Sequence, residues 1–326
     1  MNAPQFSVVI PLYNKAAEIS RALYSVLRQT VQDFEVLVIN DGSTDASPRV
    51  AATVSDSRIR IIDQTNSGEC AARNRGIAEA RSEVIAFLDA DDEWLPSFLA
   101  IMARLTGSFP EAGAYAADYL STSDAGVVYR LPKRGVPRHP WEGVLPDYFR
   151  TRNVLSSSSI VVRKDVFSNA GLFRVGVSLG GDLDMWLRIA ARYPIAYSTH
   201  PGAVIHVNAP KPASKQIELN SQSFLDRSMA EIESAADIPL CIKRRARDYV
   251  AARDLTRILL ILSLEPDFDA AQALSRWRQS HGVTAKWLLC RLATFLPDRL
   301  FRMLIAFRSF GWRAFVGPST QINNRA

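Results

Sequence analysis

Cysteine is scarce in this chain of 326 residues, which contains Cys70, Cys241 and Cys290, far apart from one another. Three scattered cysteines form neither a disulfide framework nor the spacing of a zinc site, so a reducing cytoplasm fits the sequence best. Long hydrophobic runs are missing too, since runs such as residues 258–262 are far shorter than the roughly 20 residues that span a bilayer. The N-terminus has no basic leader and its first apolar run stops at Pro11, so we expect neither a signal peptide nor a spanning helix there.

The first apolar strand is not followed by a glycine-rich turn. The chain reads Pro11-Leu12-Tyr13-Asn14-Lys15 at that point, which lacks the Gly-x-Gly-x-x-Gly spacing that binds the diphosphate of a dinucleotide. This absence disfavours a dehydrogenase. The composition is 48% hydrophobic, which is ample for a core, and the length predicts about two domains.

Acidic residues are nearly absent from the C-terminal segment that begins at Arg276. Nine basic residues there accompany one acid, Asp298, so this segment carries a net charge of +8 and the rest of the chain −2. Apolar residues recur in it at positions i, i+4 and i+7, namely Leu288, Leu292 and Phe295, then Leu300, Leu304 and Phe307. This layout predicts basic amphipathic helices. Their apolar faces either dock on an anionic membrane surface or pack on the rest of the protein, and no nucleic-acid-binding motif accompanies them.

The first 120 residues alternate apolar strands with helical patterns, which predicts a parallel sheet covered by helices. Strands are expected at residues 6–12, 34–39, 59–62 and 84–88. Helices are expected between them at residues 16–28, 45–54 and 69–80. Residues 115–206 are less regular, with a proline-rich stretch and a serine run that opens a strand into Val161 and Val162. Beyond Pro212 the pattern is helical, at residues 216–234, 242–264 and 269–279 and around Trp287 and Phe301.

The segment between Ala86 and Pro96 carries three carboxylates, Asp89, Asp91 and Asp92, at the end of an apolar strand. Like charges repel and are costly to bury unpaired, so a bound cation is the simplest explanation of their clustering. Oxygen ligands favour Mg²⁺ or Mn²⁺, and Mg²⁺ is held by one or two carboxylates together with substrate phosphates. The alternative is a solvated acidic turn that caps the helix after Pro96.

Polar residues follow three of the expected strands directly. In open α/β sheets, ligands bind beyond the carboxyl ends of the strands, so chemistry should collect there. The residues at that edge are Tyr13 and Asn14, the run Asn40-Asp41-Gly42, and Asp89 with Asp91.

Five segments of the chain, in order, resemble the family-two glycosyltransferases, which are nucleotide-sugar enzymes. They are VVIPLYN (8–14), VINDGSTD (38–45), NSGECAARNRG (66–76), FLDADD (87–92) and GDLDMWLR (181–188). The resemblance covers residues 6–206 and implies an α/β fold, a GT-A-type nucleotide-binding domain with a mostly parallel central sheet, followed by a helical C-terminal region. We therefore expect a GT-A domain over residues 1–210, with a nucleotide-binding half (1–120) and an acceptor-side half (121–210). A helical, basic region (211–316) and a disordered tail (317–326) are expected to follow.

The resemblance assigns the donor nucleotide to the ends of the first two strands. Pro11, Tyr13 and Asn14 would contact the donor, and Asp41 would recognise the nucleobase. The carboxylate of Asp41 can accept a hydrogen bond from a base or ribose at the sheet edge. The alternative for Asp41 is an Asx turn that caps the next helix.

Gly68 and Arg73 belong to the helix that, by the resemblance, contacts the nucleotide. Gly68 permits a close approach of the backbone, and Arg73, one turn into the helix, can reach a phosphate. The alternative for Arg73 is an ordinary surface arginine. Arg75 lies on another helix face and is expected in solvent.

Asp89 and Asp91 match the family's Asp-Xaa-Asp motif, which would hold the ribose and a divalent cation, Mg²⁺ or Mn²⁺. Asp92 could share that role. His206 ends the apolar run Ala203-Val204-Ile205, where related enzymes often carry a histidine that completes the metal shell. A lone histidine is otherwise an ordinary surface or core residue.

Asp182 lies near the start of an expected helix, where the family places its catalytic base. Such a carboxylate takes the proton of the acceptor hydroxyl while a metal stabilises the departing diphosphate. The sequence departs from the family here, because Gly181 replaces the usual glutamate. The alternative for Asp182 is a helix-capping aspartate, and Asp184 is expected to be structural.

These features together indicate an inverting, metal-dependent glycosyltransferase that moves a sugar from a nucleotide donor, UDP-linked in our interpretation, to an acceptor hydroxyl. By resemblance the setting is bacterial cell-surface polysaccharide synthesis, with a saccharide or lipid-linked saccharide acceptor. We expect a cytoplasmic protein that can dock peripherally at the inner face of the plasma membrane. The alternatives are a non-catalytic nucleotide-sugar-binding or assembly subunit and a sugar-nucleotide pyrophosphorylase, which would want a glycine-rich signature after the first strand.

Overall fold

The computed structural model describes residues 3–122, 126, 128–130, 133, 135–151, 154–177, 180–206 and 224–264, with side chains described up to residue 253. The chain divides into two compact units. The first comprises residues 1–212 and 230–239, and the second comprises residues 213–229 and 240–326. Each unit is described by itself below.

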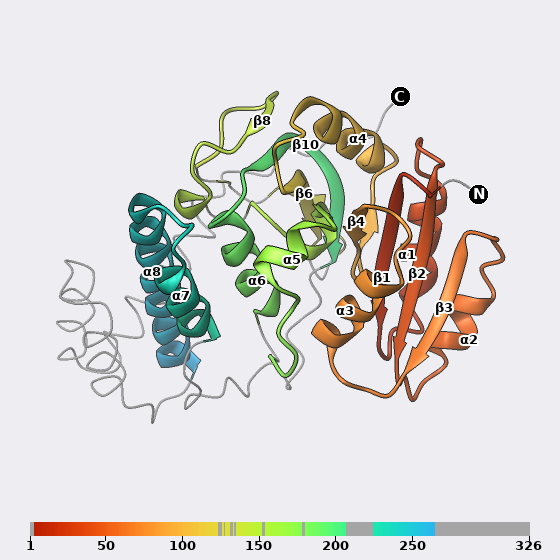
Figure 1. Cartoon of the computed structure of the whole chain (residues 1–326). Coiled ribbons are helices and arrows are strands. Elements are labelled where there is room, and N and C mark those ends of the chain that lie inside the picture. The colour runs from red at the N-terminus through yellow and green to blue at the C-terminus, as the bar shows by residue number, and fades with distance from the viewer. Residues whose placement is uncertain are drawn as a thin grey trace. The chain divides into compact units, whose positions relative to one another are not determined.

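The first unit is built on a ten-stranded sheet (Figure 1). Eight of its strands follow the order β3-β2-β1-β4-β9-β6-β10-β5, and in addition β7 pairs with β6 and β8 pairs with β10. Its strands are β1 (Phe6–Leu12), β2 (Phe34–Asp41), β3 (Ile59–Gln64), β4 (Val84–Phe87), β5 (Glu93–Trp94), β6 (Ala114–Thr122), β7 (Val128–Tyr129), β8 (Glu142–Val144), β9 (Ile160–Arg163) and β10 (Ile195–His206). The first four strands in this order are parallel, as are β6 and β10, and the remaining pairs are antiparallel. The carboxyl ends of β1, β2 and β4 therefore meet at one edge of the sheet.

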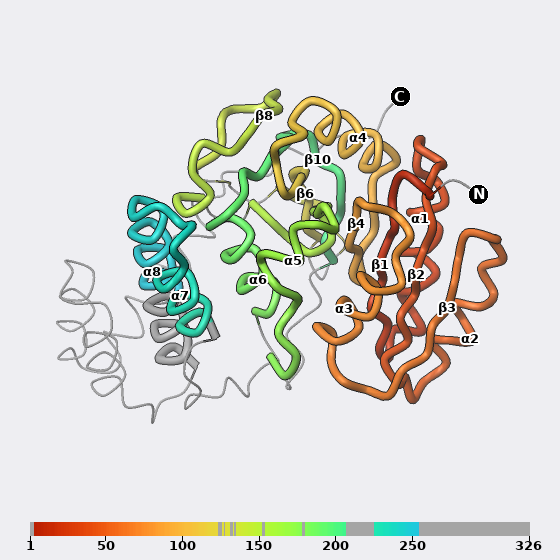
Figure 2. The backbone as a smooth tube through the Cα atoms, in the orientation of Figure 1, coloured from red at the N-terminus to blue at the C-terminus, as the bar shows by residue number. Residues whose placement is uncertain are grey.

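Helices cover both faces of this sheet. They are α1 (Ile19–Leu27), α2 (Ser47–Ala52), α3 (Glu69–Glu79), α4 (Phe98–Ser108), α5 (Val166–Ala170) and α6 (Gly181–Ala190), with short 3₁₀ turns at η1 (Tyr148–Arg150) and η2 (Ser157–Ser159). Figure 2 follows the backbone from the red strands β1 and β2 to the green β10. This arrangement is an α/β fold with helices on a central sheet, as the sequence predicts.

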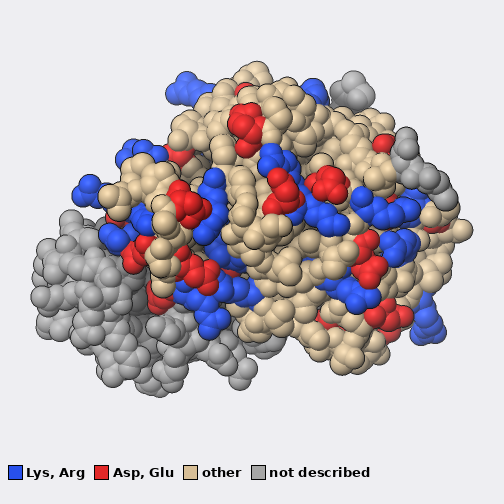
Figure 3. All heavy atoms as spheres, in the orientation of Figure 1, with Lys and Arg blue, Asp and Glu red and all other residues tan. Residues whose placement is uncertain are grey.

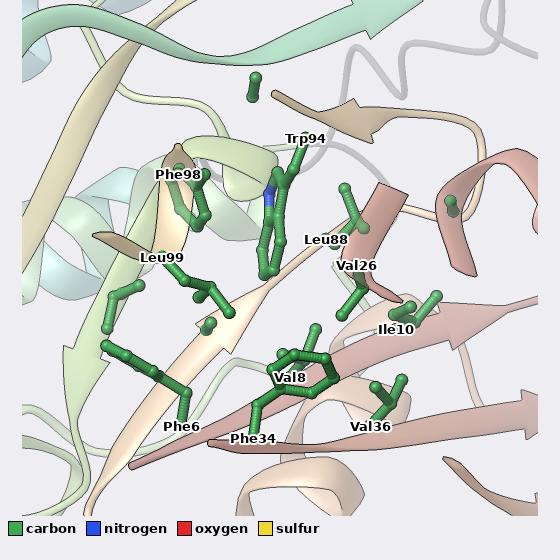
Figure 4. Close-up of a cluster of buried hydrophobic side chains, with 14 of the residues drawn as sticks. Phe6, Val8, Ile10, Val26, Phe34, Val36, Leu88, Trp94, Phe98 and Leu99 are labelled. Atoms are coloured by element: carbon green, nitrogen blue, oxygen red, sulfur yellow. The ribbon is translucent and has the colours of Figure 1, made fainter. Parts of the chain in front are cut away.

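Alternate residues of β1 pack on the two layers of helices. Val8 and Ile10 point into the cluster of buried side chains in Figure 4, where α4 contributes Phe98 and Leu99. Val9 points the other way, and a Cβ at Gly76 of α3 would lie only 2.2 Å from its side chain. Burying one such apolar side chain stabilises the fold by about 1.5–3 kcal/mol, so these two layers fix the strands that carry the site.

The predicted elements of the first 120 residues are confirmed, with shifts of one to three residues at their ends. β2 runs to Asp41 rather than to residue 39, so this aspartate is the last residue of the strand. Helix α1 begins at Ile19 rather than at residue 16. The residues before it are held by the neighbouring loop instead, because Asn14 has a positive φ of 52° and the Lys15 N–H donates to Ser47 Oγ at 2.7 Å.

The longest strand of the sheet, β10, was not predicted. It pairs in parallel with β6 from Ala114 to Thr122, with register shifts around Pro201. A proline and a glycine, Pro201 and Gly202, interrupt the apolar pattern of its sequence, and such residues sit in strands only at irregular positions of this kind. The predicted strand through Val161 and Val162 is confirmed as β9.

Helix α7 (Phe224–Ser234) starts in the second unit and ends in the first, and α8 (Leu240–Leu264) lies in the second. The helix predicted at residues 242–264 is thus confirmed. The helices predicted at 269–279 and around Trp287 and Phe301, the basic segment and the tail lie outside the described residues. Within the described part, no helix combines the length and apolarity needed to cross a membrane. On the face shown in Figure 3, acidic and basic side chains of the described residues are intermixed.

Candidate active site

Asp41 ends β2 and is 2% exposed. Its carboxylate accepts hydrogen bonds from the Gln64 side chain at 2.7 Å and from the N–H groups of Ser67 and Gly68, both at 2.9 Å. The aspartate therefore fixes the segment that leads into α3. The Asx-turn alternative is wrong for this residue, because the neighbouring Asn40 is the one whose side chain accepts from the Ser43 N–H.

Asn14, Tyr13 and Pro11 lie where β1 ends, beside the end of β2. Pro11 is buried in the strand, and Tyr13 is 47% exposed. Asn14 is locked to the turn after β2, since its side-chain oxygen accepts from the Thr44 N–H at 2.8 Å. The structure thus brings the first two groups of predicted donor residues together at one edge.

Asp89 and Asp91 follow β4 at the same edge. Asp89 Oδ1 accepts from Arg73 Nη2 at 2.8 Å, and Asp91 Oδ2 from Lys15 Nζ at 2.5 Å. Both side chains keep about a quarter of their surface exposed, 27% and 25% respectively. Strand β5 separates these aspartates from α4, whose N-cap is Ser97, so the interpretation of the acidic run as a helix cap is wrong.

Arg73 is the buried centre of the cluster, with a side chain only 2% exposed. Its guanidinium pairs with Asp89 and with Glu69, one helical turn back, and lies 5.4 Å from the centroid of the Phe173 ring. Although burial opposes it, the charges of Asp89 and Glu69 raise the pKa of Arg73. The surface-arginine alternative is therefore wrong. Arg75 is 52% exposed, as predicted, and pairs with Glu79.

Glu69, the first residue of α3, was missed as a site residue. Although 57% of its side-chain surface is exposed, the surrounding protein takes the carboxylate partly out of water. This burial, together with the charge of Asp89, raises the pKa of Glu69 to about 7. The signal was present in the sequence, because Glu69 and Arg73 stand at i and i+4 on a predicted helix. Lys15, which pairs with Asp91, was also missed, although it directly follows the Asn14 motif.

Asp182 lies in the first turn of α6, after the N-cap Gly180, and accepts from the Leu183 N–H at 2.8 Å. Burial raises its pKa, while the positive charge of Arg73 lowers it. Asp182 also contributes to the raised pKa of Glu69. These interactions bring Asp182, from the far end of the sequence motifs, to the cluster around Arg73. We call Glu69, Asp89, Asp91 and Asp182 the carboxylate edge.

Asp92 and His206 are turned to other partners. Asp92 is 3% exposed and accepts from Ser158 Oγ at 2.5 Å and from the His206 N–H at 2.9 Å. Burial and the charge of Asp89 raise the pKa of Asp92 well above its usual range. The His206 ring contacts Glu93 through Nε2 at 3.0 Å and Thr122 through Nδ1 at 3.4 Å. Their ligand atoms are thus engaged within the protein.

Comparison with known proteins places this architecture. A model of the family described as glycosyl transferase family 2 matches residues 7–168. The chain is 30% identical over 217 residues to WcaA of Escherichia coli (strain K12), whose name describes it as a colanic acid biosynthesis glycosyl transferase. The match covers 64% of this chain and 74% of WcaA. The chain belongs to glycosyltransferase family 2.

Other family members match shorter parts of the chain. EpsH of Bacillus subtilis (strain 168), which carries the name of a glycosyltransferase, is 38% identical over 153 residues, 44% of each protein. The matched segment of this chain therefore spans less than half the length of EpsH.

Solved structures show the same fold at low identity. The structure of Staphylococcus aureus TarS 1–349 superposes with a TM-score of 0.68 at 19% identity, covering 94% of this chain and 92% of that one. TarS 1–349 was also solved in complex with UDP-GlcNAc. The mannosyltransferase PcManGT of Pyrobaculum calidifontis, in complex with GDP-Man and Mn²⁺, superposes with a TM-score of 0.55 at 20% identity, covering 94% and 85% of the two chains. These likenesses support the GT-A assignment of the fold.

The glycine that replaces the usual glutamate of the family has a structural counterpart on α3. A Cβ at Gly181 would lie 2.5 Å from Cys70 Sγ. Because contacts under about 3 Å force neighbouring atoms to move, the Cys70 side chain occupies the space that a side chain at 181 would need. Asp184, the next acid of the helix, is fully buried and pairs with Arg188 and Arg174. It is structural, as predicted.

The residues of this family-two site suit a divalent cation that takes part of its shell from substrate. Asp89 and Asp91 each use one oxygen on a cationic side chain, and their second oxygens make no hydrogen bond within the described part of the chain. Two carboxylates are enough for Mg²⁺ when phosphates supply further ligands. No group of three or more acidic, histidine or cysteine side chains able to hold a metal occurs among the described residues, so Asp92 and His206 do not complete a four-ligand cluster there.

Proposed function

We propose that this chain transfers a sugar from a nucleoside diphosphate sugar, UDP-linked, to the hydroxyl of a saccharide acceptor, with inversion at the anomeric carbon. The observation that carries the proposal is that α6 brings Gly181 against Cys70 of α3, so that Asp182 lies close enough to Arg73 and Asp89 for their charges to act on its carboxylate. A proton acceptor and a diphosphate-binding group are the two parts that such a displacement needs. Membership of glycosyltransferase family 2 supports the reaction class.

The donor would lie across the ends of β1, β2 and β4. Tyr13 and Asn14 flank one side, and the segment fixed by Asp41 flanks the other. Asp89 and Asp91 would hold a divalent cation, which, when bound, stabilises the charge of the departing diphosphate. Arg73 and Lys15 place two further positive charges at this edge, and both favour an anionic leaving group.

Asp182 would accept the proton of the acceptor hydroxyl. At the same time the hydroxyl oxygen would bond to the anomeric carbon, and the bond from that carbon to the diphosphate would break. A general base works best when its pKa lies near the operating pH. Burial raises the pKa of Asp182 from its ordinary range in that direction. A single base opposite the leaving group is what a direct, inverting displacement requires.

We further propose that the acceptor is a saccharide or a lipid-linked saccharide of a bacterial cell-surface polysaccharide. The name of WcaA, which refers to colanic acid biosynthesis, supports this setting. A cytoplasmic protein whose basic segment after Arg276 rests on an anionic inner leaflet would meet such an acceptor at the membrane. That segment lies outside the described residues, so its docking rests on the sequence alone.

The first test is calorimetric titration of the purified full chain with UDP, GDP and dTDP, each with and without Mn²⁺. We expect UDP to bind and Mn²⁺ to tighten its binding, because the diphosphate and two aspartates would share the ion. Turnover would then be screened with sugars linked to the nucleotide that binds. If no nucleotide binds under any condition, the donor site is refuted and a non-catalytic assembly role moves ahead.

A further inference from the structure

A cavity of about 310 Å³ lies away from the carboxylate edge, in the acceptor-side half of the first unit. It is lined by Asp118 of β6, by Tyr197 and Thr199 of β10, and by Arg130, Lys133 and residues 136–139. Side chains alternate between the faces of a strand. Ala117 belongs to the buried apolar cluster that includes Phe98 of α4, so the side chain of its neighbour Asp118 points to the other face of β6.

Positive charge is in excess in this cavity. Arg130, Lys133 and Arg138 line it together with His139, whereas Asp118 is the one carboxylate among the lining residues. Asp118 is 1% exposed and accepts from Arg130 Nε at 2.5 Å, and it lies 3.2 Å from Lys133 Nζ. One carboxylate cannot neutralise three cations, so a surplus of about two positive charges remains.

Lys133 shows this surplus most directly. Its side chain is 8% exposed, and its ammonium lies 3.2 Å from the centroid of the Tyr119 ring. The ammonium carries three N–H donors, and its ion pair with Asp118 at 3.2 Å is accompanied by no further hydrogen bond of Nζ among the described residues. Burial lowers the pKa of Lys133 to about 8, although Asp118 opposes the change. A buried ammonium that shares its one carboxylate with Arg130 and leaves other donors unused favours a further anion beside it.

A second unused polar group lines the same cavity. Tyr197 is fully buried, and although the Asp118 carboxylate acts on its hydroxyl, no contact of this hydroxyl among the described residues has the geometry of a hydrogen bond. Near it, the His139 Nδ1 contacts Thr199 Oγ1 at 3.2 Å, and the Arg130 Nη2 donates to the Thr199 carbonyl at 2.6 Å. Arg130 is thereby fixed in place, while the Lys133 ammonium and the Tyr197 hydroxyl keep donors for a ligand.

We propose that this cavity, which we call the cationic pocket, binds a phosphate group carried by the acceptor. A phosphate ester brings a charge of about −1.5 to −2 and three acceptor oxygens, which matches the charge surplus and the unused donors. Arginine side chains also suit phosphate by their forked geometry. The assignment to the acceptor rests on the glycosyltransferase function proposed above. Asp118 stands four residues before Thr122, the carboxyl end of β6, which is about 13 Å along the strand.

The test is calorimetric titration of the full chain with inorganic phosphate, then with a hexose 6-phosphate and with the unphosphorylated hexose. The expected result is binding of both phosphates but not of the plain hexose, with the sugar phosphate the tighter ligand. Lys133→Met should weaken binding by about 10- to 100-fold, the loss expected when a buried hydrogen bond to a charged group disappears. Tyr197→Phe, which keeps the shape of the side chain, should weaken it by roughly 3- to 10-fold.

Arg150→Met is the matched control, since Arg150 is 81% exposed and lies outside the cavity. It removes the same charge and should leave phosphate binding unchanged. The proposal is overturned if Lys133→Met and Tyr197→Phe both bind phosphate as the parent chain does, if Arg150→Met loses binding equally, or if UDP competes with phosphate. Preference for inorganic phosphate over the sugar phosphate would overturn the acceptor assignment. Failure of the proposed function is distinguishable, because it would abolish nucleotide binding and leave phosphate binding intact.

Discussion

The carboxylate edge and the cationic pocket have opposite charge but the same construction. At the edge, four carboxylates surround two cations, and Arg73 is the buried one, at 2% exposure. In the pocket, the single carboxylate of Asp118, which is 1% exposed, pairs with Arg130 and Lys133, and Arg138 lines the same cavity. In both places one ion of the minority sign is enclosed, Arg73 at the edge and Asp118 in the pocket, and some members of the majority reach solvent. The enclosed ion organises the cluster, and the surplus charge around it is left for a ligand of opposite sign.

The largest effect should come from a majority member of the carboxylate edge. Replacing the proposed base in Asp182→Asn should lower kcat by about 10²- to 10⁴-fold, because the amide cannot take the acceptor proton. Donor binding, measured by calorimetry, should persist. Asp165→Asn is a control, since Asp165 is 62% exposed and pairs with Arg163 away from the edge. Unchanged turnover in the Asp182 variant would remove this residue from the mechanism and leave the edge as a binding surface.

Removing the minority ion tests its role as organiser. Arg73→Met should destabilise the chain by about 3–5 kcal/mol, because Asp89 and Glu69 then share the edge without their buried counter-ion. Urea unfolding followed by circular dichroism measures the change. Arg75→Met is the control from the same helix, and its exposed pair with Glu79 should contribute about 0–1 kcal/mol. An equal loss of unfolding free energy in the two variants would mean that the buried Arg73 stabilises the chain no more than an exposed arginine does.

The two clusters also differ in how far the sequence reveals them. Two members of the carboxylate edge, Asp89 and Asp91, directly follow an apolar strand, so strand prediction alone places them at the edge of the sheet. Its helical members, Arg73 and Asp182, were found through motif resemblance. The burial of Arg73 could not be predicted, because it depends on Phe173, which lies 100 positions along the chain.

The cationic pocket could not be predicted at all. Its lining includes a segment without helical or strand periodicity and also β10, whose Pro201 and Gly202 hide the strand in the sequence. From the sequence alone, Arg130 and Lys133 look like ordinary charged residues in solvent. The contact between Gly181 and Cys70 is equally invisible, since nothing in two separate motifs says that their backbones approach.

The corresponding removal in the pocket should have a smaller effect than the loss of Arg73. Asp118→Asn leaves Arg130, which is 40% exposed and can turn towards water, and Lys133, which can lose its proton because burial already lowers its pKa to about 8. We expect a loss of about 1–3 kcal/mol, typical of a broken buried hydrogen-bond network. Urea unfolding at pH 7 and at pH 9 measures it. A loss as large as that of Arg73→Met would show that both minority ions are equally indispensable.

The smallest effect should be the pH dependence that Glu69 gives to stability. Its pKa is raised from 4.5 to about 7 in the folded chain, so between these values the folded state holds a proton that the unfolded chain has released. Stability then falls as pH rises through this window. Glu69→Gln removes that fall, so the variant should gain on the parent chain from pH 4.5 to pH 7. We expect a gain under about 1 kcal/mol, because the side chain is 57% exposed and water screens its charge. Melting temperatures of both chains across this range provide the measurement. If the melting temperatures of the two chains change with pH in parallel, the carboxylates do not repel one another. The carboxylate edge then needs no further cation to balance its charge.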